Sequence, residues 1–195
     1  MLEDAFEKYV SNYDITNDDI KLKYDHSFRV MKLQEKYAKL LGFSDEDVEL
    51  AKTIGLLHDI GRFEQLRVYN TYNDEISIDH ADYSCEQLFD KGEIKNFVSN
   101  KDWYPIIEYA IKNHNKRVMG ENDDKRAIMH LKLIKDTDKI DIIYLLGSLN
   151  LKDLAPGKEK VHKNVMNEFM SHKLVNKKYD KNRRSQRILW SHMRC

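Results

Sequence analysis

The chain has 195 residues, with 33 Lys and Arg against 33 Asp and Glu and a hydrophobic fraction of 41%, which fits one globular domain because domains hold roughly 100–200 residues. With only 7 Gly and 2 Pro, the chain lacks the many turns of a sandwich or barrel. Two distant cysteines, Cys85 and Cys195, exclude a disulfide framework and a cysteine-based zinc ribbon and fit a reducing cytoplasm.

Helical periodicity begins at the N-terminus, with apolar stripes over 2–13 and from 20 to 33. Ser44, followed three residues later by Asp47, is a variant of the capping box and predicts a helix over 45–58. Gly42 is expected to end the helix that precedes this one. Gly61 is expected to stop the helix over 45–58. The stretch 70–79, rich in Asn, Asp, Thr and Ser, predicts a loop.

Further helices are predicted over 79–89, 102–113 and 124–146, and less apolar ones over 159–169 and 181–193. Residues 157–195 carry eleven Lys or Arg against three Asp or Glu, which leaves 22 against 30 in residues 1–156. We therefore expect an all-α bundle over 1–156 with a basic helical extension, 157–195, packed on the same domain. That extension either contacts phosphates or is a solvated helix face. No apolar run approaches the ~20 residues of a membrane span, and the acidic N-terminus does not resemble a signal peptide.

His58 and Asp59 are adjacent in GLLHDIG, where an apolar helix stops. Neighbours in a continuing helix point about 100° apart, but at a helix end the backbone can turn so that both side chains converge. A buried imidazole beside a buried carboxylate needs its charge compensated, and a metal ion is one way to do this. The alternative is a structural pair that is hydrogen-bonded in the core.

Two other anomalies complement this pair. His26 lies inside an apolar helix, and Asp136 and Asp138 lie in the otherwise apolar segment LIKDTDKIDII. A mixed site of imidazoles and carboxylates suits Mn, Fe, Co, Ni, Zn or Mg rather than a thiol-selected metal. The four expected metal ligands are His26, His58, Asp59 and Asp138, with Asp136 as the alternative to Asp138. The remaining histidines outside any such pattern are His130, His162, His172 and His192.

The order of HSFRV, LLHDIGR and DTDKID over 24–144 resembles the H…HD…D signature of the HD-domain superfamily of metal-dependent phosphohydrolases. The resemblance implies a helical bundle in which these four residues bind a first divalent ion. It favours Asp138 over Asp136, since the family's aspartate usually precedes a basic and an aliphatic residue.

Members that hold two ions have further histidines, similar in placement to His80 in SIDHADYS and His114 in IKNHNKR. The resemblance implies that these two residues bind a second ion and that Asp59 bridges the pair. The alternative is that His80 caps the helix after the loop and His114 ends its own helix.

The negative charge of a substrate's phosphate group must be balanced by positively charged side chains. The candidates are Arg62, Lys116, Arg117 and Lys139, each with a solvated surface role as the alternative. We expect Asp59, Arg62 and Lys139 to be the catalytic residues. The loop 70–79 could form a wall of the pocket.

The sequence therefore predicts a cytoplasmic phosphohydrolase that uses one or two divalent ions to activate water against a nucleotide or other phosphate ester. The text after His114, NKRVMG, lacks the Gly-Tyr-Pro of the family's cyclic di-GMP phosphodiesterases and leaves the substrate open. The alternative is a non-catalytic HD-fold module that binds nucleic acid, a nucleotide or a protein partner. It is disfavoured because all four ligand positions are filled and a pI of about 7.1 is not strongly cationic.

Overall fold

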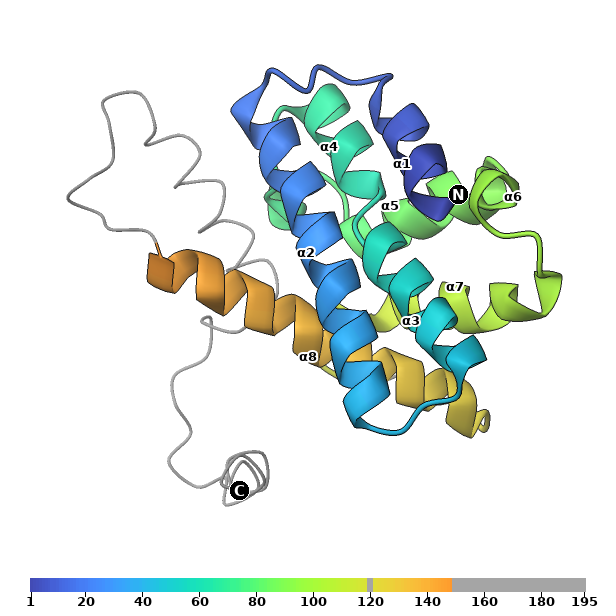
Figure 1. The fold of residues 1–195 in the computed structure, drawn as a ribbon. Helices are drawn as coiled ribbons and strands as arrows, with labels where there is room; N and C mark the ends of the chain where they lie inside the picture. Colours follow the sequence, from blue (N-terminus) through green and yellow to red (C-terminus); the bar gives the residue numbers. More distant parts are fainter. Residues whose placement is uncertain (119–120, 149–195) are drawn as a thin grey trace.

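The structure, a computed structural model, describes residues 1–118 and 121–148, and these residues form helices and connecting loops without a strand (Figure 1). The main helices are α1 Leu2–Val10, α2 Asp18–Leu40, α3 Asp45–Leu57, α4 Gly61–Tyr69, α5 His80–Cys85, α6 Ile94–Phe97, α7 Tyr104–Asn113 and α8 Lys125–Ser148. Three short turns complete them: the 3-10 turns η1 Asp74–Ile76 and η3 Lys101–Trp103, and the π-helical turn η2 Glu86–Asp90. The all-α prediction is confirmed. The expected basic extension, 157–195, lies outside the described residues.

Several helices begin where the sequence places a cap. Ser44 Oγ accepts a hydrogen bond from Asp47 N at 3.1 Å at the start of α3, as the capping-box pattern predicts. Gly42 follows α2 with a φ of +74°, a conformation that glycine adopts without a steric penalty. These local signals fix the beginning of α3 and the end of α2.

The helix α4 is a correction to the sequence analysis, because Gly61 begins a helix where the sequence predicts that one ends. The reason is that α4 is buried on several sides: Phe63 and Leu66 lie in the core, and so do the polar side chains of Arg62 and Gln65. A helix with inward-facing polar residues has no one-sided apolar stripe. The predicted loop 70–79 is interrupted by one 3-10 turn, η1.

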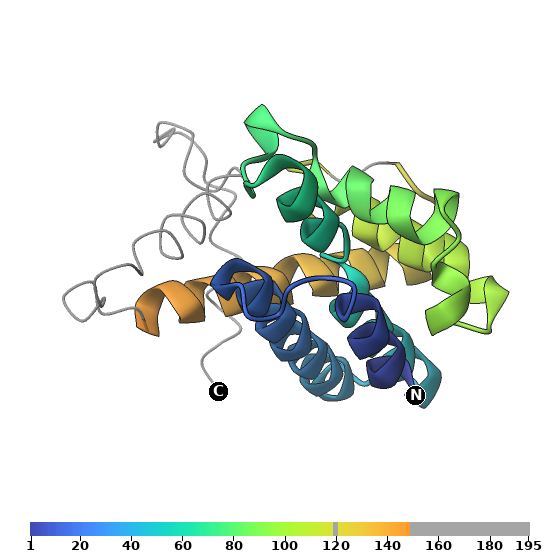
Figure 2. The ribbon, with the colours of Figure 1, turned by 90° about the horizontal axis from the view of Figure 1, so that it is seen from above.

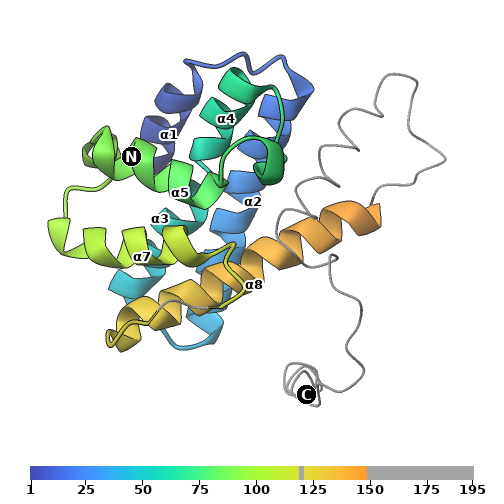
Figure 3. The same ribbon diagram turned by 180° about the vertical axis from the view of Figure 1, so that it is seen from behind.

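The helices α2, α3 and α7 pack against α8. Figure 1 shows α2 and α3 side by side, with α8 crossing both, and Figure 2 shows α2 on one side of α8 and α7 on the other. From behind, in Figure 3, α5 and α7 lie next to each other. At the opposite end of the bundle α1 closes the core, where Phe6 packs edge-on against Phe28 and Phe63 with ring centroids 5.7 and 5.8 Å apart. Within the described ranges, no helix is both long and apolar enough to span a membrane.

Candidate metal centre

The side chains that the sequence nominates as ligands meet in the interior of the bundle. They come from α2, the junction of α3 and α4, the first residue of α5, the end of α7 and the middle of α8. Each is at most 3% exposed, and their donor atoms form overlapping groups in which all atoms lie within 4.8 Å of one another. The cluster consists of His26, His58, Asp59, His80, His114 and Asp138.

The first half of the cluster gathers around one oxygen of Asp59. His26 Nε2 lies 3.2 Å from His58 Nε2 and 3.2 Å from Asp138 Oδ1. Asp59 Oδ2 lies 3.6 Å from His26 Nε2 and 3.7 Å from His58 Nε2. Imidazole nitrogens and carboxylate oxygens converging in this way are the donor set that first-row divalent ions accept.

The second half gathers around the other oxygen of Asp59. His80 Nε2 and His114 Nε2 are 3.1 Å apart, and each lies 3.6 Å from Asp59 Oδ1. Asp59 is fully buried, and its Oδ1 accepts no hydrogen bond from the described part of the chain. A buried acceptor left in this state costs about 1–3 kcal/mol or more, so this oxygen is placed to take a cation. The residues present therefore fit divalent metal on both sides of Asp59.

Carboxylates orient one histidine in each half. His26 Nδ1 lies 2.7 Å from Asp141 Oδ2, and Asp141 in turn accepts hydrogen bonds from Arg29 at 2.7 and 2.9 Å. His80 Nδ1 makes a short hydrogen bond to Asp74 Oδ2. Metal-binding histidines commonly use such a carboxylate to fix the ring.

The other two histidines are oriented by backbone carbonyls. His58 Nδ1 donates to Gly55 O at 2.8 Å, and His114 Nδ1 donates to Ile111 O at 2.6 Å. Because a carbonyl oxygen can only accept, the ring proton sits on Nδ1 and the lone pair of Nε2 faces the cluster. The rings are thus held in the tautomer that a metal ion requires.

Two glycines of GLLHDIG allow this convergence. A Cβ at Gly55 would lie 2.7 Å from Gln34 Cγ and 3.0 Å from Met31 Cα, so α3 approaches α2 closely one turn before His58. A Cβ at Gly61 would lie 2.5 Å from Ser84 N, and Gly61 N donates to Ser84 Oγ at 2.9 Å. Because glycine has no side chain, Gly55 and Gly61 allow α2 and α5 to approach the His-Asp pair closely.

A buried lysine balances the cluster's charge. Lys23, 1% exposed, donates from Nζ to Asp59 Oδ2 at 2.8 Å. Burial lowers the pKa of Lys23 to about 8, although Asp59 opposes the shift. Burial also disfavours ionised Asp59, but Lys23 and the neighbouring imidazoles hold the pKa of Asp59 well below its usual value.

His58 and His80, one from each half of the cluster, differ in proton affinity. Burial and the nearby Arg62 lower the pKa of His80 to about 4. Burial opposes protonation of His58 too, but Asp59 and Asp138 raise its pKa. At neutral pH His80 is therefore neutral, the form that coordinates metal.

Arg62 has a different environment from the one expected. Its side chain is fully buried, and its NH1 donates to Gln65 Oε1, Tyr72 O and Asp74 Oδ1 at 2.7, 2.8 and 2.8 Å. The guanidinium group therefore supports the carboxylate that orients His80. This placement favours a positioning role over the phosphate contact that the sequence predicts.

The other predicted phosphate contacts lie outside the cluster. Lys116 forms ion pairs with Asp79 and Asp82 at 2.9 and 3.0 Å. Arg117 is exposed after the end of α7, and Lys139 is half-buried next to Asp138 in α8. Their contact with phosphate stays a prediction.

Sequence reasoning missed the residues that surround the ligands. Lys23 precedes His26 by three residues and Asp141 follows Asp138 by three, so helical spacing places each on the same face as a ligand. That spacing was a usable signal. Asp74 lies in a polar loop and had none. Of the two aspartates considered, Asp138 is in the cluster while Asp136 is exposed.

His130 lies away from the cluster, as expected. Its Nε2 is 3.0 Å from Asp47 Oδ1, where it joins α8 to the first turn of α3. The other unassigned histidines, His162, His172 and His192, lie outside the described residues.

The family model of the HD domain matches residues 24–143, a segment that contains all six clustered residues. The chain therefore belongs to the HD domain family, whose members are commonly metal-dependent hydrolases. Comparisons with curated proteins and with solved structures give no match.

Proposed function

We propose that this protein is a divalent-metal-dependent phosphohydrolase that hydrolyses a nucleotide or another phosphate ester with two ions bridged by Asp59. The observation that carries the proposal is that the two oxygens of one buried carboxylate, Asp59, face different pairs of histidines. Its Oδ2 faces His26 and His58, and its Oδ1 faces His80 and His114. Family membership supports the reaction class.

His26, His58 and Asp138 would hold one ion, His80 and His114 the other, and Asp59 both. Ions bound there would supply activated water near neutral pH and a Lewis acid for the phosphoryl oxygen. The chain's own contribution is orientation and charge, because each imidazole is fixed through Nδ1 and keeps Nε2 directed at the cluster.

Lys23 acts on Asp59 rather than as a metal ligand. Its ammonium group donates to Asp59 Oδ2, so it keeps Asp59 ionised and fixed in one rotamer. The remaining predicted phosphate contacts are Lys116, Arg117 and Lys139, of which Lys139 adjoins a ligand in sequence. A cytoplasmic location stays a prediction from the cysteine content.

The test is hydrolysis of a panel of nucleoside mono-, di- and triphosphates, simple phosphomonoesters and phosphodiesters, followed by chromatographic separation of substrate and products. The full chain would be assayed with Mn, Fe, Co, Ni, Zn and Mg after removal of bound metal. We expect hydrolysis of at least one class of ester, its loss with a chelator, and its loss in Asp59→Asn with the helical circular dichroism retained.

The control variant is Asp136→Asn, which removes an exposed carboxylate two residues from Asp138 and should hydrolyse the ester at the wild-type rate. A metal-loaded protein that hydrolyses nothing in the panel would contradict the proposal. That result would favour the alternative, a non-catalytic HD-fold module that binds a nucleotide, nucleic acid or protein.

A further inference from the structure

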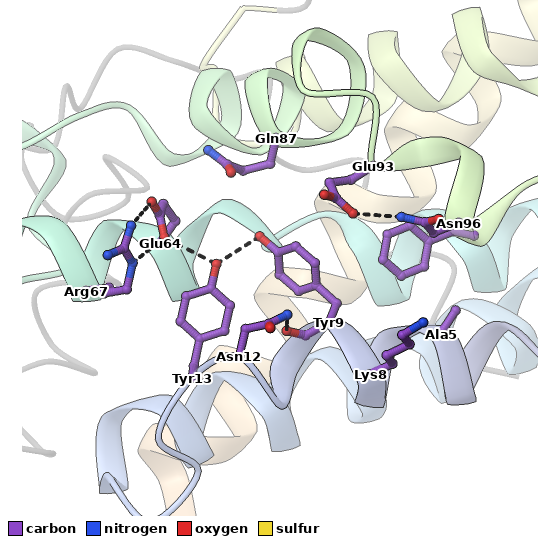
Figure 4. Close-up of a pocket in the computed structure, with 11 residues that line it drawn as sticks. Ala5, Lys8, Tyr9, Asn12, Tyr13, Glu64, Arg67, Gln87, Glu93 and Asn96 are labelled. Carbon is purple, nitrogen blue, oxygen red and sulfur yellow. Dashed lines mark hydrogen bonds and ion pairs between the residues drawn. The ribbon is translucent and has the colours of Figure 1, made fainter.

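A groove of about 570 Å³ lies between α1, α4 and the π-helical turn η2, with α6 at one end (Figure 4). None of the six clustered residues lines it. Its volume falls within the roughly 300–1,000 Å³ of small-molecule sites. It is therefore a second candidate binding site, separate from the metal centre.

The wall formed by η2 contains a buried amide with an unused donor. Gln87 is 4% exposed. Its Oε1 accepts a hydrogen bond from Lys91 Nζ at 3.1 Å, whereas its Nε2 donates none within the described ranges. Buried polar groups are normally paired, and π-helical turns are frequent at functional sites. In Figure 4 this amide lies across the groove from Tyr9 and Tyr13.

The opposite wall offers an acceptor. Tyr13 Oη donates to Glu64 Oε2 at 3.3 Å, and the hydroxyls of Tyr9 and Tyr13 are 3.1 Å apart. Because Tyr13 donates its hydroxyl proton to Glu64, Tyr9 must be the donor in the hydrogen bond between the two tyrosines. Tyr9 Oη therefore keeps a lone pair that can accept a hydrogen bond from a ligand. Burial raises the pKa of Tyr13 to about 12 and that of Tyr9 further, so both are neutral hydroxyls.

Neighbouring side chains contact both Glu64 and Tyr9. Arg67 holds Glu64 through two hydrogen bonds of 2.7 and 2.5 Å. The ring of Tyr9 packs against that of Phe97 with centroids 6.2 Å apart. The groove thus combines aromatic surface with the unused donor of Gln87 and the acceptor of Tyr9.

We propose that this groove binds the base of a nucleoside or nucleotide. A nucleobase is a flat ring with donors and acceptors along one edge, so it can accept from Gln87 Nε2 and donate to Tyr9 Oη. Aromatic side chains stack on any base. Lys8, exposed on the same groove, supplies a cation for a phosphate. The proposal does not depend on the metal centre.

The test is calorimetric titration of the full chain, in a chelator, with the four ribonucleoside 5′-monophosphates and with ribose 5-phosphate. We expect at least one nucleotide to bind tenfold or more tightly than ribose 5-phosphate. Gln87→Leu should weaken that binding at least tenfold, and Tyr9→Phe, which keeps the ring, should weaken it as well. Asn100→Leu, which alters an exposed amide outside the groove, should leave it unchanged.

Three results would overturn the inference: no nucleotide binds better than ribose 5-phosphate, both groove variants bind as the wild type does, or Asp59→Asn abolishes binding. The last would place the nucleotide at the metal centre, so the groove proposal would fail while the proposed function stood. If Gln87→Leu does not fold, Tyr9→Phe decides alone.

Discussion

The two sides of Asp59 are built differently. The Oδ2 side has a second carboxylate, Asp138, and a buried ammonium group, Lys23, within the same contact network. Its histidines lie within α2 and at the end of α3, two helices that pack directly on each other. Within the described part of the chain, the Oδ1 side presents the imidazoles of His80 and His114 beside the shared carboxylate.

This difference predicts unequal affinity. The Oδ2 side offers four ligands, two of them carboxylates, whereas the Oδ1 side offers three, so the first ion gains one more ligand even though the ammonium group of Lys23 offsets carboxylate charge on that side. The second ion depends on the orientation of the His80 ring by Asp74 and of the His114 ring by a backbone carbonyl. A chelator should therefore empty the Oδ1 side first.

Replacement of the shared carboxylate should have the largest effect. Asp59→Ala removes a carboxylate ligand from both sides, so we expect loss of both ions. Loss of the buried ion pair between Asp59 and Lys23 should also destabilise the fold by about 3–5 kcal/mol. Metal analysis and urea unfolding measure the two effects, and Asp136→Ala should change neither. Full retention of metal would show that Asp59 is not a ligand.

Removal of a ligand from one side should halve the metal content. In His80→Ala the Oδ1 side keeps one imidazole, whereas His26, His58 and Asp138 are untouched. We expect the variant to keep one mole of metal per mole of chain. This metal should resist the chelator as strongly as the ion bound on the Oδ2 side of the wild type. An unchanged stoichiometry in elemental analysis would exclude His80 from the site.

Loss of the carboxylate that orients His80 should have a smaller effect. Asp74→Asn weakens the hydrogen bond to His80 Nδ1 and the ion pair with Arg62. Such outer contacts are worth about 10–100-fold in metal affinity, and we expect this loss for one of the two ions. A competition titration with a coloured chelator measures it. The control, Asp82→Asn, alters an exposed carboxylate of α5, the helix that begins with His80, and should leave both affinities unchanged.

The smallest expected effect lies far from the cluster, where α3 meets α8. Burial opposes ionisation of Asp47, but His130 and Arg126 lower its pKa to about 2. A carboxyl group with a depressed pKa stabilises the fold above its unfolded value, near 4, and loses that contribution as the pH falls toward 2.

Asp47→Asn should therefore unfold more easily than the wild type at neutral pH, with a difference that shrinks below pH 4. Denaturant unfolding at a series of pH values measures this difference. The metal content should stay unchanged, because Asp47 contacts no clustered residue. A difference that is constant with pH would contradict the assigned cause.

The sequence predicted the cluster better than its surroundings. His26, His58 and Asp138 were recognisable because polar residues in apolar helices are conspicuous, and Ser44 located the start of α3. In contrast, the sequence could not show that Gly61 starts a helix, because the close contact with Ser84 is a tertiary interaction. Asp74 was hidden for a similar reason, since a polar loop gives no periodicity from which to infer direction.

The central claim is that one buried aspartate, Asp59, lies between two metal positions and serves one with each of its carboxylate oxygens. Elemental analysis of the purified full chain, reconstituted with a first-row divalent metal, tests it most directly when the wild type and His80→Ala are compared. We predict about two moles of metal per mole of wild-type chain, as in two-metal hydrolytic sites, and half of that in the variant. Equal content in both proteins, or no metal in either, would contradict the claim.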